Sequence, residues 1–407
     1  MMQVSEAGVS FSIPDRNEGL DPIPASQDVP KRTDPVFFNP KQALNRDISL
    51  LVLHAWREVG YLLDSVAEPF AGSGVRSLRY ALQGPPLTDL YVSDKSSLAI
   101  QTCQENFARH QGQVEGRGTH VHFSELSFRA FLHTFEEEKP PFDFVDVDPF
   151  GTPQPFVRDA LRYLRKPGLI ALTATDMPTI TGIYPDKTYK TYQAPAFKVR
   201  ERSYCHEIGL RMFLAWLQRE GLAIGLVLTP VLSYFKDHYI RVFARRERHG
   251  RTGEVLQSHG YVIDCRHCGG RTKVLWQDSL RKPTACQYCG QPGSLLGPLF
   301  LGPLHDLTLV SRMADLLPQL VRGGMIDRHY RLKRFFPLLQ QDLVVDSPWF
   351  FDVASLGKRY NVRLPSPQEV IDVLVRDGWE ASLTHFSGQG LKTNFPLDRE
   401  LPPEFAP

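Results

Sequence analysis

Four of the six cysteines fall into two close pairs, a spacing typical of a metal site. Cys265 and Cys268 form the first pair, Cys286 and Cys289 form the second, and two residues separate the members of each pair. Thiolates in this pattern bind Zn²⁺ tetrahedrally and leave no open coordination position. The pattern therefore predicts a structural zinc ion and not a catalytic one. Two redox pairs, or a spacing that arose by chance, are the alternatives that the pattern leaves open.

A second motif, Asp148-Pro149-Phe150-Gly151, follows a short apolar run and could act on an amine. The exocyclic amine of a nucleobase is a poor nucleophile because its lone pair is delocalised into the ring. Acceptors that hold its N–H groups localise this lone pair, and a carboxylate can also take the released proton. Asp148 and the Pro149 carbonyl suit these tasks, and an extruded base could stack on Phe150. The alternative is a loop in which the proline ends a strand and Phe150 belongs to the core.

Two glycines and two acids ahead of this motif could hold a nucleoside cofactor. Gly72 and Gly74, within EPFAGSGVR (68–76), allow a sharp turn between a strand and a helix. Asp94 ends the next apolar run, where a carboxylate can accept hydrogen bonds from ribose hydroxyls, and Glu125 ends the run after it. A glycine turn alone is weakly specific. The pattern fits either S-adenosylmethionine or a dinucleotide.

Alternating strands and helices are expected to position these residues. Apolar runs predict strands at 65–70, 90–94, 120–125, 142–148, 169–176, 222–231 and 239–246. Helical patterns occur at 43–63, 75–83, 96–111, 156–164 and 204–221. This alternation predicts a mostly parallel, twisted sheet with the candidate residues at the carboxyl ends of its strands. Residues 1–35 look like a loose lead-in with one short hairpin at Val9–Ile13.

Taken together, these segments resemble one family, the tRNA guanine-26 N2-dimethyltransferases. The motifs that carry the resemblance are VFFNPKQALNRD (36–47), EPFAGSGVRSLRY (68–80), VSDKS (92–96), DVDPFGTP (146–153), TATDMPTITG (173–182), YCHEIGLR (204–211), GPLHD (302–306) and THFSGQGLKTN (384–394). The resemblance implies a Rossmann-like class I methyltransferase sheet, S-adenosylmethionine as the methyl donor and tRNA as the partner. The implied reaction methylates the N2 amine of guanine 26, twice, to give N2,N2-dimethylguanosine.

The resemblance also implies roles for single residues. The implied cofactor contacts are Arg46, Arg76, Asp94, Glu125 and Leu126. Asp148 would be the catalytic acceptor, and Phe37 and Phe150 would sandwich the target base. Glu125-Leu126 departs from the Asp-Ala usual in the family, and because Glu is one methylene longer, the adenine contact there is expected to be displaced.

The domain organisation changes after residue 250. We expect a methyltransferase domain over 36–250, a zinc-binding segment over 251–299, and a smaller α+β domain over 300–407 that binds tRNA, as the resemblance implies. Basic residues near aromatic ones suit RNA. They cluster as Lys236, Arg241, Arg245, Arg246, Arg248 and Arg251; as Arg328, Arg331, Lys333 and Arg334 beside Phe335 and Phe336; and as Lys358, Arg359 and Arg363. Each cluster taken alone is more often a solvated face, and it is the presence of three clusters that favours an RNA surface.

Bulk properties narrow the class of protein. The chain has 407 residues and a net charge of +2, so its overall charge does not indicate a nucleic-acid partner. No segment approaches the ~20 apolar residues that cross a bilayer. The first residues lack a signal-peptide pattern, and the cysteines are too few and too clustered for a secreted disulfide framework. We expect a cytoplasmic monomer.

Three other functions remain as alternatives. A DNA adenine amino-methyltransferase shares the acid-proline-aromatic logic, but its usual motif has two prolines where this chain has one. A zinc-ribbon RNA-binding protein without catalytic activity would not need Asp94, Asp148 and Arg46 together. A nicotinamide dehydrogenase would be expected to carry G-x-G-x-x-G, which the turn at 68–76 lacks.

Overall fold

The computed structural model describes residues 1–407 except 16–33, 138, 195–201, 280–284, 328 and 406–407. Much of the predicted lead-in therefore lies outside the described residues. The chain forms two compact units. Unit 1 comprises residues 1–172 and 311–333, and unit 2 comprises residues 173–310 and 334–407.

The largest sheet has seven strands in the order β5-β4-β3-β6-β7-β9-β8. Its strands are β3 (Ser65–Glu68), β4 (Asp89–Asp94), β5 (His120–Glu125), β6 (Phe142–Val147), β7 (Leu164–Ala174), β8 (Leu228–Lys236) and β9 (Tyr239–Arg246). The pairs β3–β4, β3–β6, β4–β5 and β6–β7 are parallel, and β8–β9 is antiparallel. The predicted α/β fold with a mostly parallel sheet is confirmed.

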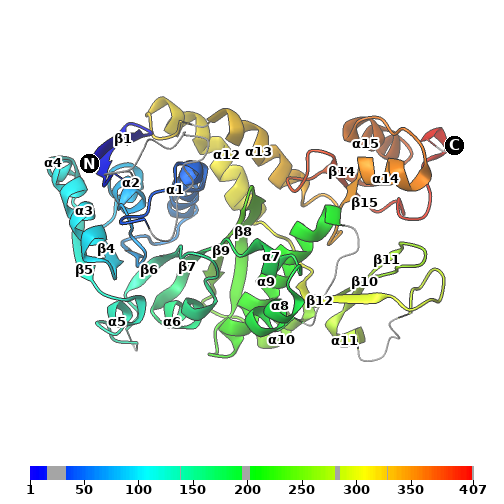
Figure 1. Ribbon diagram of the computed structural model, residues 1–407, viewed down its shortest axis with the longest axis horizontal. Helices are drawn as coiled ribbons and strands as arrows, with labels where there is room; N and C mark the ends of the chain where they lie inside the picture. The colour runs from blue at the N-terminus through cyan, green and yellow to red at the C-terminus, as the bar shows by residue number, and fades with distance from the viewer. Residues whose placement is uncertain (16–33, 138, 195–201, 280–284, 328, 406–407) are drawn as a thin grey trace. The chain divides into compact units, whose positions relative to one another are not determined.

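Helices cover both faces of the parallel strands in unit 1. They are α1 (Ala43–Glu58), α2 (Val75–Gln83), α3 (Ser97–Ala108), α4 (Gln111–Gly116), α5 (Phe128–Leu132) and α6 (Val157–Arg162). Helices α1 and α2 lie on one face of the sheet, and α5 and α6 lie on the other (Figure 1). Because both faces are covered, every residue of β6 is buried, which explains why its sequence is continuously apolar apart from two acids. Unit 1 also holds the hairpin β1 (Met2–Glu6) and β2 (Val9–Ile13) and most of α12 (Leu307–Arg322).

Unit 2 adds two small sheets to the β8–β9 hairpin. Strands β10 (His259–Asp264), β11 (Arg271–Leu275) and β12 (Ser294–Phe300) pair in the order β11-β10-β12, and β13 (Phe351–Asp352), β14 (Ala381–Leu383) and β15 (Gly390–Thr393) pair in the order β13-β15-β14. The helices are α7 (Met177–Ile180), α8 (Pro185–Tyr192), α9 (Cys205–Leu222), α10 (Thr252–Gln257), α11 (Trp276–Ser279), most of α13 (His329–Gln341), α14 (Val353–Tyr360) and α15 (Pro367–Arg376). The expected smaller α+β part near the C-terminus is thus present. Within the described residues, no helix has the length and apolar character needed to span a membrane.

The strand predicted at 222–231 is wrong at its start. Helix α9 ends at Leu222, the chain turns at Gly225 with a φ of 73°, and β8 begins only at Leu228. A glycine in the left-handed conformation is a common way to end a helix. Because the end of the helix and the start of the strand are both apolar, hydrophobicity alone did not separate them.

The N-terminal hairpin is attached to unit 1 through the buried carboxylate of Glu6. Arg46 donates to it from Nε at 2.7 Å and from Nη2 at 2.6 Å, and Arg79 donates from Nη1 at 2.8 Å. Arg79 also pairs with Asp47 at 2.8 Å, and all four side chains are buried. Burial alone would raise the pKa of Glu6, but the two guanidinium groups outweigh it and lower the pKa to about 2. The hairpin is therefore held by charge as well as by apolar packing.

We expect Glu6→Gln to destabilise the fold by about 3–5 kcal/mol at pH 7, because it leaves two buried arginines short of a counter-charge. The pKa of Glu6 is lower in the folded chain than its ordinary value of 4.5. Its contribution is therefore present above pH 4.5 and is lost as the pH falls toward 2. Urea unfolding of the wild-type chain and of Glu6→Gln, at pH 7 and at pH 3, measures this. The difference between their free energies of unfolding should be smaller at pH 3 than at pH 7.

The matched control is Glu58→Gln, which removes a half-exposed ion pair with Arg312. A surface pair of this kind contributes about 0–1 kcal/mol. Equal unfolding midpoints for the two variants at pH 7 would contradict the role assigned to Glu6.

Candidate active site and metal centre

The glycine turn after β3 brings Phe37 beside the predicted cofactor loop. Gly72 and Gly74 have φ values of 54° and 75°. A Cβ atom at position 72 would lie 2.8 Å from the carbonyl oxygen of Phe37, which accepts a hydrogen bond from the Ser73 N–H at 3.1 Å. Glycine at position 72 is thus required both by the left-handed backbone and by the close approach of another segment of the chain.

Asp94 and Glu125 lie side by side at the carboxyl ends of β4 and β5, where the register pairs them. Asp94 accepts a hydrogen bond from the Gly72 N–H through Oδ2 and one from the Ser96 N–H through Oδ1, each at 3.0 Å. Each carboxylate oxygen retains a second lone pair, so Asp94 can also accept from ribose hydroxyls. Glu125 is exposed and Leu126 is half-buried. This edge, with its glycine turn, fits a nucleoside ligand.

A buried arginine lies behind the predicted catalytic residue. Arg76 donates from Nη2 to Asp148 Oδ2, and from Nη1 to Asp146 Oδ2 at 3.3 Å. The Asp148 side chain remains 13% exposed, whereas the Arg76 side chain is only 4% exposed. Burial raises the pKa of the neighbouring Glu68 to about 8, so this carboxyl group is protonated at neutral pH. The Arg76 guanidinium therefore pairs with Asp146 and Asp148, whereas the resemblance implied that it contacts the cofactor.

Arg46, the other arginine assigned to the cofactor, faces the N-terminal hairpin. Its Nε and Nη2 atoms donate to Glu6, and Nη2 also donates to the Asn39 carbonyl at 3.1 Å. Its guanidinium lies 5.5 Å from the centre of the Phe38 ring. Nη1 has no hydrogen-bond acceptor among the described residues. Only the Nη1 side of the Arg46 guanidinium therefore remains available to contact a cofactor.

The two aromatic rings expected to sandwich the base do come together. Phe37 and Phe150 meet edge to face, with ring centres 4.4 Å apart and planes at 73°. Phe150 is 47% exposed, so the alternative that placed it in the core is wrong. In this contact no base fits between the rings. A sandwich therefore requires the exposed Phe150 ring to turn away from Phe37.

The four paired cysteines converge on one point in unit 2. Cys265 Sγ lies 3.5 Å from Cys289 Sγ, and Cys268 Sγ lies 3.5 Å from Cys286 Sγ. All four sulfur atoms lie within 4.8 Å of one another, and none forms a disulfide. Zn–S bonds of ~2.3 Å in a tetrahedron place sulfur atoms ~3.8 Å apart, so the cluster fits zinc. Because these contacts join the two pairs, the geometry favours one metal site over two redox pairs.

Comparison with known proteins identifies the family. The sequence profile of the N2,N2-dimethylguanosine tRNA methyltransferases matches residues 20–401. The chain belongs to this family. It is an S-adenosylmethionine-dependent tRNA (guanine-N2)-dimethyltransferase. The function predicted from the sequence is confirmed, and the DNA methyltransferase, dehydrogenase and non-catalytic alternatives are not supported.

Relatives match along almost the whole chain. The tRNA (guanine(26)-N(2))-dimethyltransferase of Natronomonas pharaonis is 31% identical over 401 residues, with 97% of each chain covered. The enzyme of that description from Pyrococcus furiosus is 30% identical over 375 residues, with 89% of this chain and 91% of the relative covered. Among solved structures, Trm1 from Pyrococcus horikoshii in complex with S-adenosyl-L-methionine matches with a TM-score of 0.78, 25% identity and 98% of each chain covered.

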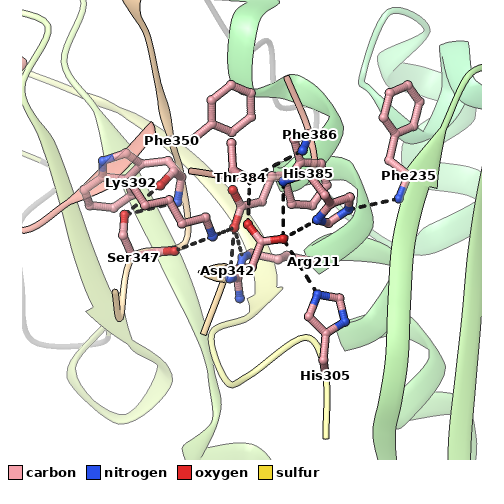
Figure 2. Close-up of polar contacts among 12 residues, drawn as sticks. Arg211, Phe235, His305, Asp342, Ser347, Phe350, Thr384, His385, Phe386 and Lys392 are labelled. Atoms are coloured by element: carbon pink, nitrogen blue, oxygen red, sulfur yellow. Dashed lines mark hydrogen bonds and ion pairs between the residues drawn. The ribbon is translucent and has the colours of Figure 1, made fainter. Parts of the chain in front are cut away.

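Family motifs without a predicted role meet at the buried carboxylate of Asp342 in unit 2 (Figure 2). Thr384 donates from Oγ1 to Asp342 Oδ1 at 2.6 Å, and His385 Nδ1 contacts Oδ2. His305, from the GPLHD motif, places Nε2 3.8 Å from that same oxygen. Burial would raise the pKa of Asp342, but the two histidines and Lys392 outweigh it and hold the pKa far below its usual range. Sequence reasoning missed Asp342 because a lone acid in the apolar stretch PLLQQDLVV carries no spacing signal.

The third motif, YCHEIGLR, joins the same network through Glu207. Lys392 donates from Nζ to Glu207 Oε1 at 2.6 Å and to the Ser347 carbonyl at 3.2 Å, as Figure 2 shows in part. Arg211 pairs with Glu207 at 2.9 Å and donates to the Phe300 carbonyl at 3.0 Å. Segments far apart in the sequence are thus tied together by buried charge.

Backbone donors decide how the two imidazoles face Asp342. The Ser233 N–H donates to His305 Nδ1 at 3.4 Å, and the Phe235 N–H donates to His385 Nε2 at 3.3 Å. In a neutral imidazole the proton is then on the other nitrogen, which faces Asp342. A metal ion would need the lone pairs of those inner nitrogens, and a ligating histidine normally donates its outer N–H to an acceptor. Here the outer nitrogens meet donors, so the cluster is better suited to a hydrogen-bonded clamp than to a metal site.

The structure removes two residues from the predicted RNA surface. Arg241 is fully buried, donates to Thr173 Oγ1 at 2.8 Å and lies 4.8 Å from the centre of the Phe243 ring. Arg246 is only 9% exposed. Both predictions are wrong because the side chains belong to strand β9 inside unit 2. Arg328 lies outside the described residues. The exposed members of the clusters are Arg248, Arg251, Arg331, Lys333, Arg334, Lys358, Arg359 and Arg363.

We expect Asp342→Asn to lower the stability of the chain by about 3–5 kcal/mol, because it removes the charge that two histidines and a lysine face in a buried site. Asp346→Asn is the matched control, since Asp346 is 79% exposed and pairs with Lys273 at the surface. That control should cost less than about 1 kcal/mol. Thermal unfolding and elemental analysis of both variants measure this. If Asp342→Asn loses a metal ion that the control retains, the clamp interpretation is wrong.

Proposed function

We propose that the carboxyl edge of β4, β5 and β6 methylates the N2 amine of guanine 26 in tRNA, with Asp148 as the catalytic acceptor. The observation that carries the proposal is the position of Asp148. It follows β6 directly, is partly exposed, and has one carboxylate oxygen bonded to Arg76. The half-exposed Phe150 and the turn at Gly72 lie at this end of the strands. Relatives that match this chain are tRNA (guanine(26)-N(2))-dimethyltransferases.

The cofactor would be held by the glycine turn and the acids beside it. S-adenosylmethionine, when bound, supplies an electrophilic methyl group. We assign the ribose hydroxyls to Asp94, whose two oxygens are already oriented by backbone N–H groups. Glu125 and Leu126 would lie against the adenine ring, and the Nη1 side of Arg46 would contribute a cationic contact. Support comes from the related Trm1 of Pyrococcus horikoshii, which binds S-adenosyl-L-methionine.

The residues of the chain would then act on the amine. Asp148 and the Pro149 carbonyl accept its two N–H groups, localise the nitrogen lone pair and allow the proton to leave to the carboxylate. Phe37 and Phe150 hold the extruded ring once Phe150 has turned. After the first methyl transfer only one N–H remains, so the second transfer relies on a single acceptor.

We expect Asp148→Asn to lower the single-turnover methylation rate by ~10²–10⁴-fold, because it removes the basic oxygen but keeps the shape. Binding of tRNA and cofactor should change little, since the carboxylate matters most as charge develops on the nitrogen. Rapid-quench measurements at saturating tRNA and cofactor, with nucleoside mass analysis, isolate this step. Asp159→Asn, at a surface pair with Arg129, is the control. A variant rate within about threefold of wild type would mean that Asp148 is only structural.

We also propose that the four cysteines bind a structural zinc ion that supports tRNA binding by residues 300–407. Arg359 donates to the carbonyl of Cys268, and the Arg399 guanidinium lies 4.5 Å from the centre of the Tyr288 ring. The loops that carry the cysteines therefore contact C-terminal residues directly. Zinc there would fix the loops and, through them, the nearby basic side chains. The ion takes no part in the reaction because four thiolates fill its coordination sphere.

Elemental analysis should find one zinc ion per chain in protein purified without chelator. Cys286→Ser should lose that ion, unfold more easily and bind tRNA more weakly, because metal binding supplies folding energy to small segments of this kind. Its single-turnover rate at saturating tRNA should stay near wild type. Cys205→Ser is the control, since Cys205 lies outside the cluster. Active protein that contains no zinc would rule the proposal out.

A further inference from the structure

The guanidinium of Arg76 lies among three carboxyl groups that come from β3, from β6 and from the residue after β6. Nε lies 3.5 Å from Glu68 Oε1, Nη1 lies 3.3 Å from Asp146 Oδ2, and Nη2 contacts Asp148 Oδ2. The side chains of Glu68 and Asp146 are 3% and 0% exposed, against 13% for Asp148. A cation this deeply buried requires such partners. Of these three carboxyl groups, that of Asp148 is the most exposed to solvent.

Helix α1 fixes the side of the guanidinium that faces away from Asp148. Nη1 donates to Asn45 Oδ1 at 3.0 Å and to Ser49 Oγ at 3.3 Å. These two residues are one helical turn apart, so they present their side chains on one face of the helix. Two acceptors on a rigid helix leave the planar guanidinium little freedom to rotate.

Asp146 is held as firmly as Arg76 and is closed to substrate. Its Oδ2 accepts from the Tyr80 hydroxyl at 2.6 Å as well as from Arg76, and the residue has no exposed surface. Asp146 and Asp148 are two positions apart along the same extended segment, so their side chains point to the same side. The arginine therefore bridges a locked carboxylate and one at the edge of the site.

The two oxygens of Asp148 differ in their surroundings. Oδ2 contacts Arg76, and in the described part of the chain the Asp148 carboxylate has no other hydrogen-bond partner. Oδ1 is therefore open to a substrate N–H. A carboxylate that rotated freely would present either oxygen in many directions.

We propose that Arg76 is a positioning residue for Asp148: it binds Oδ2 so that Oδ1 is the oxygen that meets the guanine amine. This inference rests on the catalytic role proposed above for Asp148. It differs from the assignment of Arg76 to the cofactor, because all three of its nitrogen atoms already face protein acceptors. At neutral pH the protonated Glu68 adds no charge, since burial raises its pKa to about 8. The positive charge of Arg76 is thus shared by Asp146 and Asp148.

A double-mutant cycle with Arg76→Lys and Asp148→Asn tests the proposal. Lysine keeps the charge but lacks the planar fork that reaches α1 and Asp148 together. We expect Arg76→Lys to lower the single-turnover rate at saturating substrates by about 10- to 100-fold in the wild-type background, since small misplacements cost that much. In the Asp148→Asn background the same substitution should cost less than about threefold. Affinity for S-adenosylmethionine, measured by calorimetry, should change by less than about threefold in both backgrounds.

Asn45→Ala provides a second, milder test if Arg76→Lys folds poorly. It removes one anchor of the guanidinium and leaves every charge in place, so it should lower the rate only when Asp148 is present. The thermal unfolding of each variant is recorded beside its rate.

The outcomes separate the competing roles. An equal loss of rate in both backgrounds would show that Arg76 acts independently of Asp148 and would overturn the inference. A tenfold or larger loss of cofactor affinity with a normal rate at saturation would instead make Arg76 a cofactor ligand. If Asp148→Asn alone keeps a near wild-type rate, the proposed function of Asp148 fails first, and this inference fails with it.

Discussion

A single buried cation, the guanidinium of Arg76, connects the elements of the proposed methyltransferase site. The guanidinium of Arg76 connects α2 to α1 through Asn45 and Ser49 and to the end of β6 through its two aspartates. Arg76 stands two positions after Gly74, so the turn that shapes the proposed cofactor loop also sets where the guanidinium enters the proposed site. Buried ion pairs add little stability compared with apolar packing of similar volume. Their value here is directional, because a guanidinium binds its acceptors only in its own plane.

The same principle acts at the far edge of the sheet in unit 2. Strand β8 is the last strand of its sheet, and an edge strand leaves alternate N–H and C=O groups without a strand partner. Here the Val231 carbonyl accepts a hydrogen bond from the Asp306 N–H. The N–H groups of Ser233 and Phe235 donate to the imidazoles of His305 and His385. Asp342 fixes those imidazoles from the other side. The hydrogen-bonded clamp of Asp342, His305 and His385 therefore covers the edge strand β8 and attaches the C-terminal residues to it.

Much of this organisation could be predicted from the sequence because it depends on local patterns. Alternating apolar runs and helical periodicity determined the parallel strands, since burial on both faces requires continuous apolar sequence. The cysteine spacing indicated a four-thiolate cluster, because a tight turn brings residues three apart to one metal ion. Asp94, Glu125 and Asp148 could be placed at one edge, because parallel strands end on the same side of their sheet.

Only the tertiary structure decided which groups face each other within that framework. Nothing local to Arg76 tells that it binds Asp148, 72 positions away, and nothing local to Glu6 tells that it binds Arg79, 73 positions away. Asp342 belongs to no recognisable motif. Arg241 was predicted to be exposed because it belongs to a basic run, but it lies in strand β9 and is buried. The strand prediction at 222–231 was wrong for a related reason. The end of α9 and the start of β8 are both apolar, so composition alone does not separate them. Hydrogen-bond partners and burial depend on contacts between distant segments, and a one-dimensional pattern does not contain those distances.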